Sequence, residues 1–158
     1  MILDSGTRKE FESGAVRDVQ EGKGRCDLLP LDVLSVLYSE DIFDCIYNFT
    51  RDGNVVHLYE VLFKIADKFG GLTSMVLETS IHFEEGCNKY GERNWETGIP
   101  AKCFISSAVR HLLKWMRGDD DENHERAFVW NIMCCIWTCK NKPELNDYEV
   151  QKWIKTQL

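Results

Sequence analysis

The fold is decided by residues 101–118, which read Ala101-Lys-Cys-Phe-Ile-Ser-Ser-Ala-Val-Arg-His-Leu-Leu-Lys-Trp-Met-Arg-Gly118. Apolar side chains recur along this stretch with the spacing of one face of an α-helix. The inward set is Phe104, Ile105, Ala108, Leu112 and Trp115. Gly118 is the expected stop, because glycine adopts the left-handed conformation that ends many helices. The pattern predicts a helix over residues 101–117 with one buried face.

The same period recurs on both sides of this stretch. We expect helices at residues 31–38, 40–50, 55–69 and 73–90 before it, and a largely buried helix through 127–138 after it. In the helix at 73–90 the inward side chains are expected to be Val76, Leu77, Ile81 and Phe83. No segment shows the alternation of a strand, and no internal repeat is present. The chain is therefore predicted to be all-α, a helical bundle.

Capping residues mark where several of these helices begin. Ser39 is expected to cap the helix at 40–50, and the aspartates at 119–121 are expected to cap the buried helix that follows, since acids suit the positive end of a helix dipole. Asn146 begins a capping-box-like sequence. A short closing helix is expected after it, with Val150, Trp153 and Ile154 as its apolar side chains.

Composition bounds the class of protein. The chain has 158 residues, of which 44% are hydrophobic, and this is ordinary for one globular core.

Residues 1–30 are polar and glycine-rich, so they are either an ordered N-terminal arm or a solvated leader, while residues 31–158 form the helical domain. The net charge of −7 argues against nucleic acid as the main partner, because phosphate backbones are bound by surplus lysine and arginine. An acidic protein can still hold phosphates through a bound metal.

Cysteine usage indicates the redox compartment. The seven cysteines form no C-x-x-C pair, and several lie in apolar runs where a free thiol packs as a small hydrophobe. A reducing, cytoplasmic compartment is therefore expected. No apolar run approaches the ~18 residues of a membrane-spanning helix, and the first residues lack the features of a signal peptide. No membrane partner is expected.

Two acidic clusters are the candidate metal site. Glu78, His82 and Glu85 stand at i, i+4 and i+7 and so share one helix face, which by itself is more often a solvated stripe. The second cluster contains Asp121, Glu122, His124 and Glu125. It opens a helix that turns apolar at once, and a buried helix that begins with so many acids needs cations. Two such helices facing each other would hold a hard divalent ion through carboxylate oxygens.

Zinc is the less favoured metal. His82 and His124 are possible zinc ligands, but no H-E-x-x-H or paired-cysteine spacing supports a tetrahedral site.

Basic and aromatic groups near the acids are candidates for substrate binding. The cations are Lys89, Arg93, Arg110, His111 and Lys114, and Arg110 and Lys114 share one helix face. They either grip phosphate or form a salt-bridged surface. Asn94 and Trp95 either hydrogen-bond and stack on a base, or Trp95 plugs the core beneath its loop.

Several segments resemble those of the phage and bacterial dATP/dGTP diphosphohydrolases. They are Glu85-Gly-x-x-Lys-Tyr-Gly-x-Arg-Asn-Trp95, Ala108-x-Arg-His-x-x-Lys-Trp115, Gly118, and His124 with Trp130-Asn131, together with the leader segments Gly14-Ala-Val-Arg-Asp18, Glu21-Gly-Lys-Gly-Arg25 and Asp27-Leu-Leu-Pro30. The likeness covers residues 4–137. Because this family is related to the MazG-like pyrophosphohydrolases, it implies an all-α helical bundle of the MazG-like NTP pyrophosphohydrolase type. It also implies metal-dependent cleavage of purine dNTPs to the monophosphate and pyrophosphate.

The resemblance implies roles for individual residues. Mg²⁺ or Mn²⁺ would be held by Glu78, Glu85, Asp121, Glu122 and Glu125, with Glu85 and Glu122 catalytic. Substrate would be bound by Lys89, Arg93, Asn94, Trp95, Arg110, His111, Lys114 and Asn131. The chain departs from the MazG-like E-x-x-E and E-x-x-D pairs, because His82 precedes Glu85, Glu122-x-x-Glu125 replaces the second pair, and Asn131 stands where an aspartate is expected.

The resemblance further implies a homo-oligomer, a dimer or tetramer, in the cytoplasm of a bacterial or phage-infected cell. Two other functions stay open at this point. One is a nucleotide-binding regulatory helical module without turnover. The other is a structural interaction protein whose acids are only solvated surfaces. The preferred purine and the individual metal ligands are not determined by the sequence.

Overall fold

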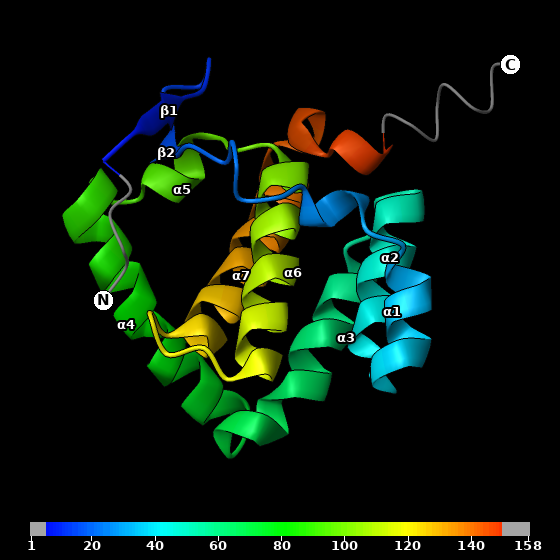
Figure 1. The fold of residues 1–158 in the computed structure, drawn as a ribbon. Helices are drawn as coiled ribbons and strands as arrows, with labels where there is room; N and C mark the ends of the chain where they lie inside the picture. Colours follow the sequence, from blue (N-terminus) through cyan, green and yellow to red (C-terminus); the bar gives the residue numbers. More distant parts are fainter. Residues whose placement is uncertain (1–5, 150–158) are drawn as a thin grey trace, which may run out of the picture.

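The computed structural model describes residues 6–149, which form an all-α bundle with one small β-hairpin (Figure 1). The α-helices are α1 (Leu31–Tyr38), α2 (Ile42–Asp52), α3 (Val56–Ile65), α4 (Leu72–Tyr90), α5 (Asn94–Thr97), α6 (Ala101–Arg117) and α7 (His124–Asn141). Three short 3₁₀ helices are η1 (Cys26–Leu28), η2 (Ala66–Phe69) and η3 (Pro143–Leu145). The predicted all-α class is confirmed.

Helices α6 and α7 are the antiparallel pair at the centre of the bundle (Figure 1). The side chains of Phe104, Ile105, Phe128 and Ile132 in this pair are fully buried. Burying each such side chain stabilises the fold by about 1.5–3 kcal/mol relative to leaving it exposed. Helices α1 to α3 lie on one side of the pair and α4 on the other (Figure 1). The helix predicted at residues 101–117 is therefore present, and it is central.

Two predicted N-caps are wrong. Ser39 ends α1 in the left-handed conformation, with a φ of 54°, and α2 begins after Asp41. At α7 the N-cap is Asn123, whose side-chain oxygen accepts a hydrogen bond from the backbone N–H of Arg126 at 2.9 Å. The aspartates at 119–121 lie in the connection instead, because Gly118 ends α6 and the chain must cross to the neighbouring antiparallel helix before α7 begins.

The buried face of α4 also differs from the prediction. Its buried residues are Met75, Thr79 and His82, which stand at i, i+4 and i+7 on the same face. Three of the four predicted inward side chains are exposed instead, Val76 by 44%, Leu77 by 65% and Ile81 by 38%. The fourth, Phe83, is partly buried against the core as predicted. Helix α4 lies at the edge of the bundle and packs on α7 and η2. Contact with α7, and not the richest apolar stripe, decides which face of α4 is covered.

The N-terminal hairpin was not predicted. Strands β1 (Arg8–Glu10) and β2 (Val16–Asp18) pair antiparallel, with Lys9 opposite Arg17. Three residues are too few to show a period of two. The hairpin is held on the bundle by Asn94, whose side-chain oxygen accepts from the N–H of Val16 and whose amide donates to the C=O of Val16, both at 2.8 Å. Residues 6–30 thus contain ordered contacts with the helices.

Toward the C-terminus, residues 147–149 are helical, and the rest of the predicted closing helix, with Val150, Trp153 and Ile154, lies outside the described residues. All seven cysteines are free thiols. Among residues 6–149, every helix is too short or too polar to cross a lipid bilayer.

Candidate functional site

A cavity of about 510 Å³ lies between the N-terminal arm and helices α4, α6 and α7. Its lining residues are Arg17, Asp18, Gln20 and Lys23 from the arm, His82, Gly86 and Tyr90 from α4, Ser107, Arg110, His111 and Lys114 from α6, Asp121 and Glu122 from the connection, and Trp130 and Asn131 from α7. This volume falls within the range of about 300–1,000 Å³ that is typical of small-molecule sites. The cavity is the candidate functional site.

Three cations of the cavity have no carboxylate partner among residues 6–149. The guanidinium of Arg17 donates to Asn131 Oδ1 at 2.6 Å, and its Nη1 is buried without a hydrogen-bond partner in the described chain. Arg110 donates to Ser107 Oγ at 2.9 Å and to the C=O of Gly24 at 3.4 Å. Lys23 stands at the exposed rim. The cavity therefore contains three cations that form no ion pair with a carboxylate of the described residues, although Asp18 lies near Lys23 and Glu122 near Arg110.

Burial makes these charges costly in the absence of an anion. It lowers the pKa of Arg17 and also that of Arg110. Burial lowers the pKa of Lys23 as well, although the nearby Asp18 opposes this shift. A bound anion would offset the cost, since cationic groups stripped of water gain most from an opposite charge.

The Asp18 carboxylate is already occupied by protein donors. Lys89 Nζ lies 2.8 Å from Asp18 Oδ2, and the Tyr90 hydroxyl donates to Asp18 Oδ1 at 2.9 Å. Burial alone raises the pKa of Asp18, but the hydrogen bonds from Lys89 and Tyr90 hold it below its usual value. Lys89, predicted to bind substrate, is thus placed where it anchors the arm to α4.

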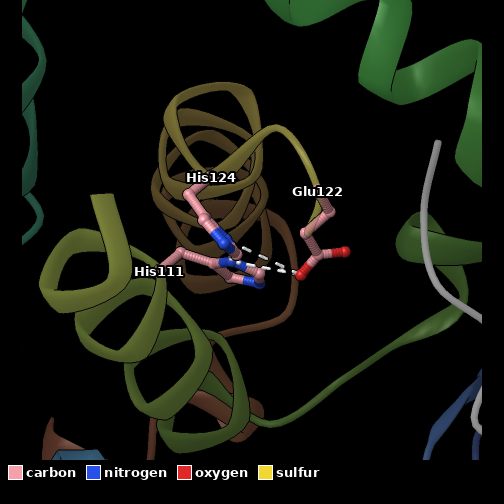
Figure 2. A group of neighbouring side chains, drawn as sticks. All are labelled: His111, Glu122 and His124. Carbon is pink, nitrogen blue, oxygen red and sulfur yellow. Dashed lines mark hydrogen bonds and ion pairs between the residues drawn. The ribbon is translucent and has the colours of Figure 1, made fainter. Parts of the chain in front are cut away.

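Two histidines and a glutamate converge beside the cavity, and Figure 2 shows how they face one another. His111 on α6 and His124 at the start of α7 face each other, with their Nδ1 atoms 3.0 Å apart. Glu122 Oε1 lies 3.5 Å from the Nδ1 of His111 and 3.8 Å from the Nδ1 of His124. These three groups have the residue types and the proximity to hold a metal ion.

Asp121 orders this cluster from the other side. Its Oδ1 lies 2.7 Å from His124 Nε2, and its Oδ2 accepts from Lys114 Nζ at 2.8 Å. The bonds from Lys114 and His124 lower the pKa of Asp121 to about 2. Burial, with Arg110 and His124 adding to it, lowers the pKa of His111 to about 2, so His111 is neutral at physiological pH. Since His124 Nε2 is directed to Asp121, its Nδ1 is the ring atom that faces His111 and Glu122.

The structure brings together only part of the predicted site. The cavity contains the predicted Arg110, His111, Lys114, Asp121, Glu122 and Asn131. Glu78 forms an ion pair with Arg126 instead, and Glu85, half-buried on α4, is outside the cavity lining. Glu125 lines a separate cavity of about 440 Å³ beside Lys68. Glu122 precedes α7 whereas Glu125 lies in its first turn, so the two carboxylates do not share a helix face.

The predicted residues of the 91–100 loop have structural contacts. Arg93 pairs with Glu96 on the exposed surface, and the Asn94 side chain is bonded to the backbone of Val16. Trp95 packs with its ring centroid 5.6 Å from that of Phe83 and 5.2 Å from that of Trp137. Of the two interpretations of Trp95, these contacts favour the core plug.

Sequence reasoning missed the arm. Arg17, Gln20 and Lys23 supply one wall of the cavity, and His82 and Trp130 supply part of another. The available signals were the basic residues among glycines in residues 14–25 and the resemblance of these segments to the family's leader. These signals do not say which helices the arm will lie against, because contacts so distant along the chain leave no local spacing.

Comparison with known families gives one match. The model of a family described as dATP/dGTP diphosphohydrolase, N-terminal, matches residues 64–148, more than half of the chain. The match spans α4, α6 and α7, which are the helical walls of the cavity, and leaves the arm outside. No curated protein and no solved structure matches the chain.

The neutral state of His82 has a consequence for stability. Burial lowers the pKa of His82 from 6.5 to about 4. Protons then bind the unfolded chain more tightly, so the free energy of unfolding falls as pH drops from about 6.5 toward about 4, by up to about 3 kcal/mol. We expect His82→Gln to flatten this dependence in urea unfolding measured from pH 7 to pH 4. His57→Gln, on α3 outside the cavity, is the control. An unchanged slope in His82→Gln would contradict the assignment.

Proposed function

The chain belongs to the dATP/dGTP diphosphohydrolase N-terminal-domain family, and we propose that it is a divalent-metal-dependent hydrolase that cleaves dATP and dGTP to the nucleoside monophosphate and pyrophosphate. The family description supports diphosphohydrolase activity and a purine deoxynucleotide as the substrate. The cations and the histidine–glutamate cluster of the cavity support the binding of a triphosphate and a metal ion at the same place.

The single observation that carries the proposal is the unpaired positive charge in the cavity. Arg17, Lys23 and Arg110 lack carboxylate partners among the described residues, in a chain whose net charge is −7. Bulk electrostatics of an acidic protein repel a nucleotide, so such local cations have an evident use as phosphate ligands. Arginine suits this role because its planar guanidinium can contact two phosphate oxygens at once.

The cluster of His111, Glu122 and His124 fits a divalent ion. Glu122, His111 and His124 supply three donor atoms, and Asp121 supports His124. We extend the proposal to a divalent metal ion at this place. Such an ion would supply neutralisation of charge at the transferring phosphorus.

Glu122 is the carboxylate best situated to accept a proton from the attacking water. The oxygens of Asp18 are bonded to Lys89 and Tyr90, and those of Asp121 to Lys114 and His124. In Glu122 one oxygen faces the two imidazoles and the other points away from them (Figure 2). That second oxygen is the one we propose as the water-orienting group. A positioned base of this kind contributes about 10²–10⁴-fold to a rate.

Trp130 offers a surface for the base. Its indole lines the cavity, and its Nε1–H is buried without a hydrogen-bond partner in the part of the chain that the structure describes. An aromatic ring in a cavity wall can stack on a base. This supports a heterocyclic base, in addition to phosphates, as the occupant.

The reaction is tested by product analysis. Purified full-length protein is incubated with each of the eight common NTPs and dNTPs, with Mg²⁺, with Mn²⁺ and with EDTA. We expect pyrophosphate and the monophosphate from dATP and dGTP with metal only, detected by ³¹P NMR and anion exchange. Inorganic tripolyphosphate with free nucleoside, or orthophosphate with diphosphate, would contradict the cleavage position. A nucleotide-dependent rise in Tm without any product would instead establish a binding module without turnover.

Phosphate binding is tested on α6. Arg110→Gln removes a cation that has no carboxylate partner, so we expect KM for dATP to rise about 10- to 100-fold, the loss typical of a charge-assisted hydrogen bond. Arg117→Gln is the matched control, because Arg117 lies on the same helix, is exposed and pairs with Asp119. Equal KM values for both variants would contradict a role for the cavity in binding phosphate.

We also propose that the chain is a homo-oligomer, supported by the apolar outward side of α4. Leu77 is 65% exposed there, and Leu72, Val76 and Ile81 accompany it. Exposed apolar patches of this kind commonly mark interfaces. We expect light scattering to give a multiple of 18.4 kDa, and Leu77→Glu to reduce it to the monomer. Leu37→Glu on α1, where Leu37 is 71% exposed, is the control. If Leu37→Glu dissociated the oligomer and Leu77→Glu did not, the interface would lie on α1 and not on α4.

A further inference from the structure

We propose that His111, Glu122 and His124 form a three-ligand site that binds a transition-metal ion, of the Mn²⁺, Co²⁺ or Zn²⁺ type, in preference to Mg²⁺. This names the class of metal for the proposed hydrolase. The role of this metal in turnover rests on the proposed hydrolase function. Metal binding does not, because it depends only on these three side chains.

The donor atoms are spaced as ligands of one ion would be. With metal–nitrogen distances of about 2.1 Å, neighbouring donors lie about 3.0 Å apart in octahedral geometry and about 3.4 Å apart in tetrahedral geometry. The observed separations are 3.0 Å between the two Nδ1 atoms, and 3.5 and 3.8 Å from these atoms to Glu122 Oε1. The triangle needs only small side-chain adjustments to close on a metal.

The surroundings of His124 match those of a metal-bound imidazole. Metal-ligating histidines almost always donate their other ring N–H to a carboxylate, a carbonyl or water. His124 Nε2 lies 2.7 Å from Asp121 Oδ1, so its Nδ1 is the ring atom left for the metal. Lys114 in turn holds Asp121, and the His124 side chain is only 1% exposed. The ligand is therefore oriented before any ion arrives.

The composition of the site selects the metal. Two of the three donors are imidazole nitrogens, whereas Mg²⁺ demands oxygen ligands and keeps several waters. Two of the predicted carboxylate ligands are elsewhere, because Glu78 pairs with Arg126 and Glu125 lines another cavity. Asp121 is nearby, but its oxygens are bonded to Lys114 and His124. Two histidines and one carboxylate leave coordination positions open, as in catalytic metal sites. His111 and Glu122 line the main cavity, so an ion that they held would lie beside it.

Binding is measured on the full-length protein without nucleotide. In calorimetric titration, or by the visible spectrum of Co²⁺, we expect Co²⁺ and Mn²⁺ to bind with a stoichiometry of one per chain, and a tenfold excess of Mg²⁺ not to displace them. Glu122→Gln, in a connection, removes a ligand with little effect on folding. We expect it to weaken Co²⁺ binding at least about tenfold, and Asp121→Asn to weaken it about 10- to 100-fold, as supporting residues of metal sites do.

Matched variants separate this site from its rivals. Glu125→Gln and His57→Asn should leave Co²⁺ affinity unchanged, because Glu125 lines the other cavity and His57 lies on α3. Loss of binding in Glu125→Gln, with Glu122→Gln unaffected, would overturn the site in favour of other carboxylates. Displacement of Co²⁺ by an equal concentration of Mg²⁺ would overturn the selectivity.

A measurement on the unaltered chain avoids any folding defect. The chain has four histidines, so their imidazole ¹⁵N signals are resolvable. Substoichiometric Mn²⁺ should broaden the signals of His111 and His124 and spare His57. Broadening of His57 alone, or of no histidine, would overturn the site.

If Mn²⁺ binds at the site but no nucleotide is hydrolysed, the proposed function fails and the metal site stands. If Mg²⁺ supports turnover while the two histidines are unaffected by Mn²⁺, the metal site fails and the function stands.

Discussion

The antiparallel packing of α6 on α7 is the constraint on which the rest of the structure depends. Side chains such as Phe104 and Phe128 are fully buried in this pair, and the short connection between the helices forces the chain to turn back directly. As a result, His111 near the end of one helix meets His124 at the start of the next. Apolar burial thus supplies the free energy that holds two imidazoles and an acidic connection together, which those polar groups would not achieve by themselves.

The arm completes the site by placing a charge where the helices alone would leave an open groove. Arg17 lies over the rings of Phe104 and Trp130, at 5.2 and 5.8 Å from their centroids, and donates to Asn131 on α7. Cation–π contact and one hydrogen bond stabilise the guanidinium without neutralising it. An arginine so placed is held ready for an anion. The family match begins only at residue 64, so this cationic wall is contributed by a part of the chain outside the matched region.

Residue spacing predicted the elements well and their environments less well. The helix at 101–117 buries Phe104, Ile105, Ala108 and Leu112 as predicted, and Trp115 partly, because a long apolar stripe can be satisfied only by contact with the core. In α4 the apolar stripe was misleading: Leu77 is exposed, and the covered face contains Thr79 and His82. The same limit explains the candidate site. Glu122 and Glu125 are three residues apart, yet a helix boundary between them sends their carboxylates into different cavities.

By itself, the sequence determined the all-α class, the approximate extent of each long helix and the acidic and basic residues available for chemistry, since helix formation depends on residues within a few positions of one another. Only the tertiary structure decided that His111, Glu122 and His124 would meet, that Arg17 would line the same cavity as His111 and Glu122, and that Glu78 and Glu125 would be elsewhere. These contacts join segments far apart along the chain. They follow from how whole helices pack, and that packing is set by the total apolar surface buried and not by any local motif.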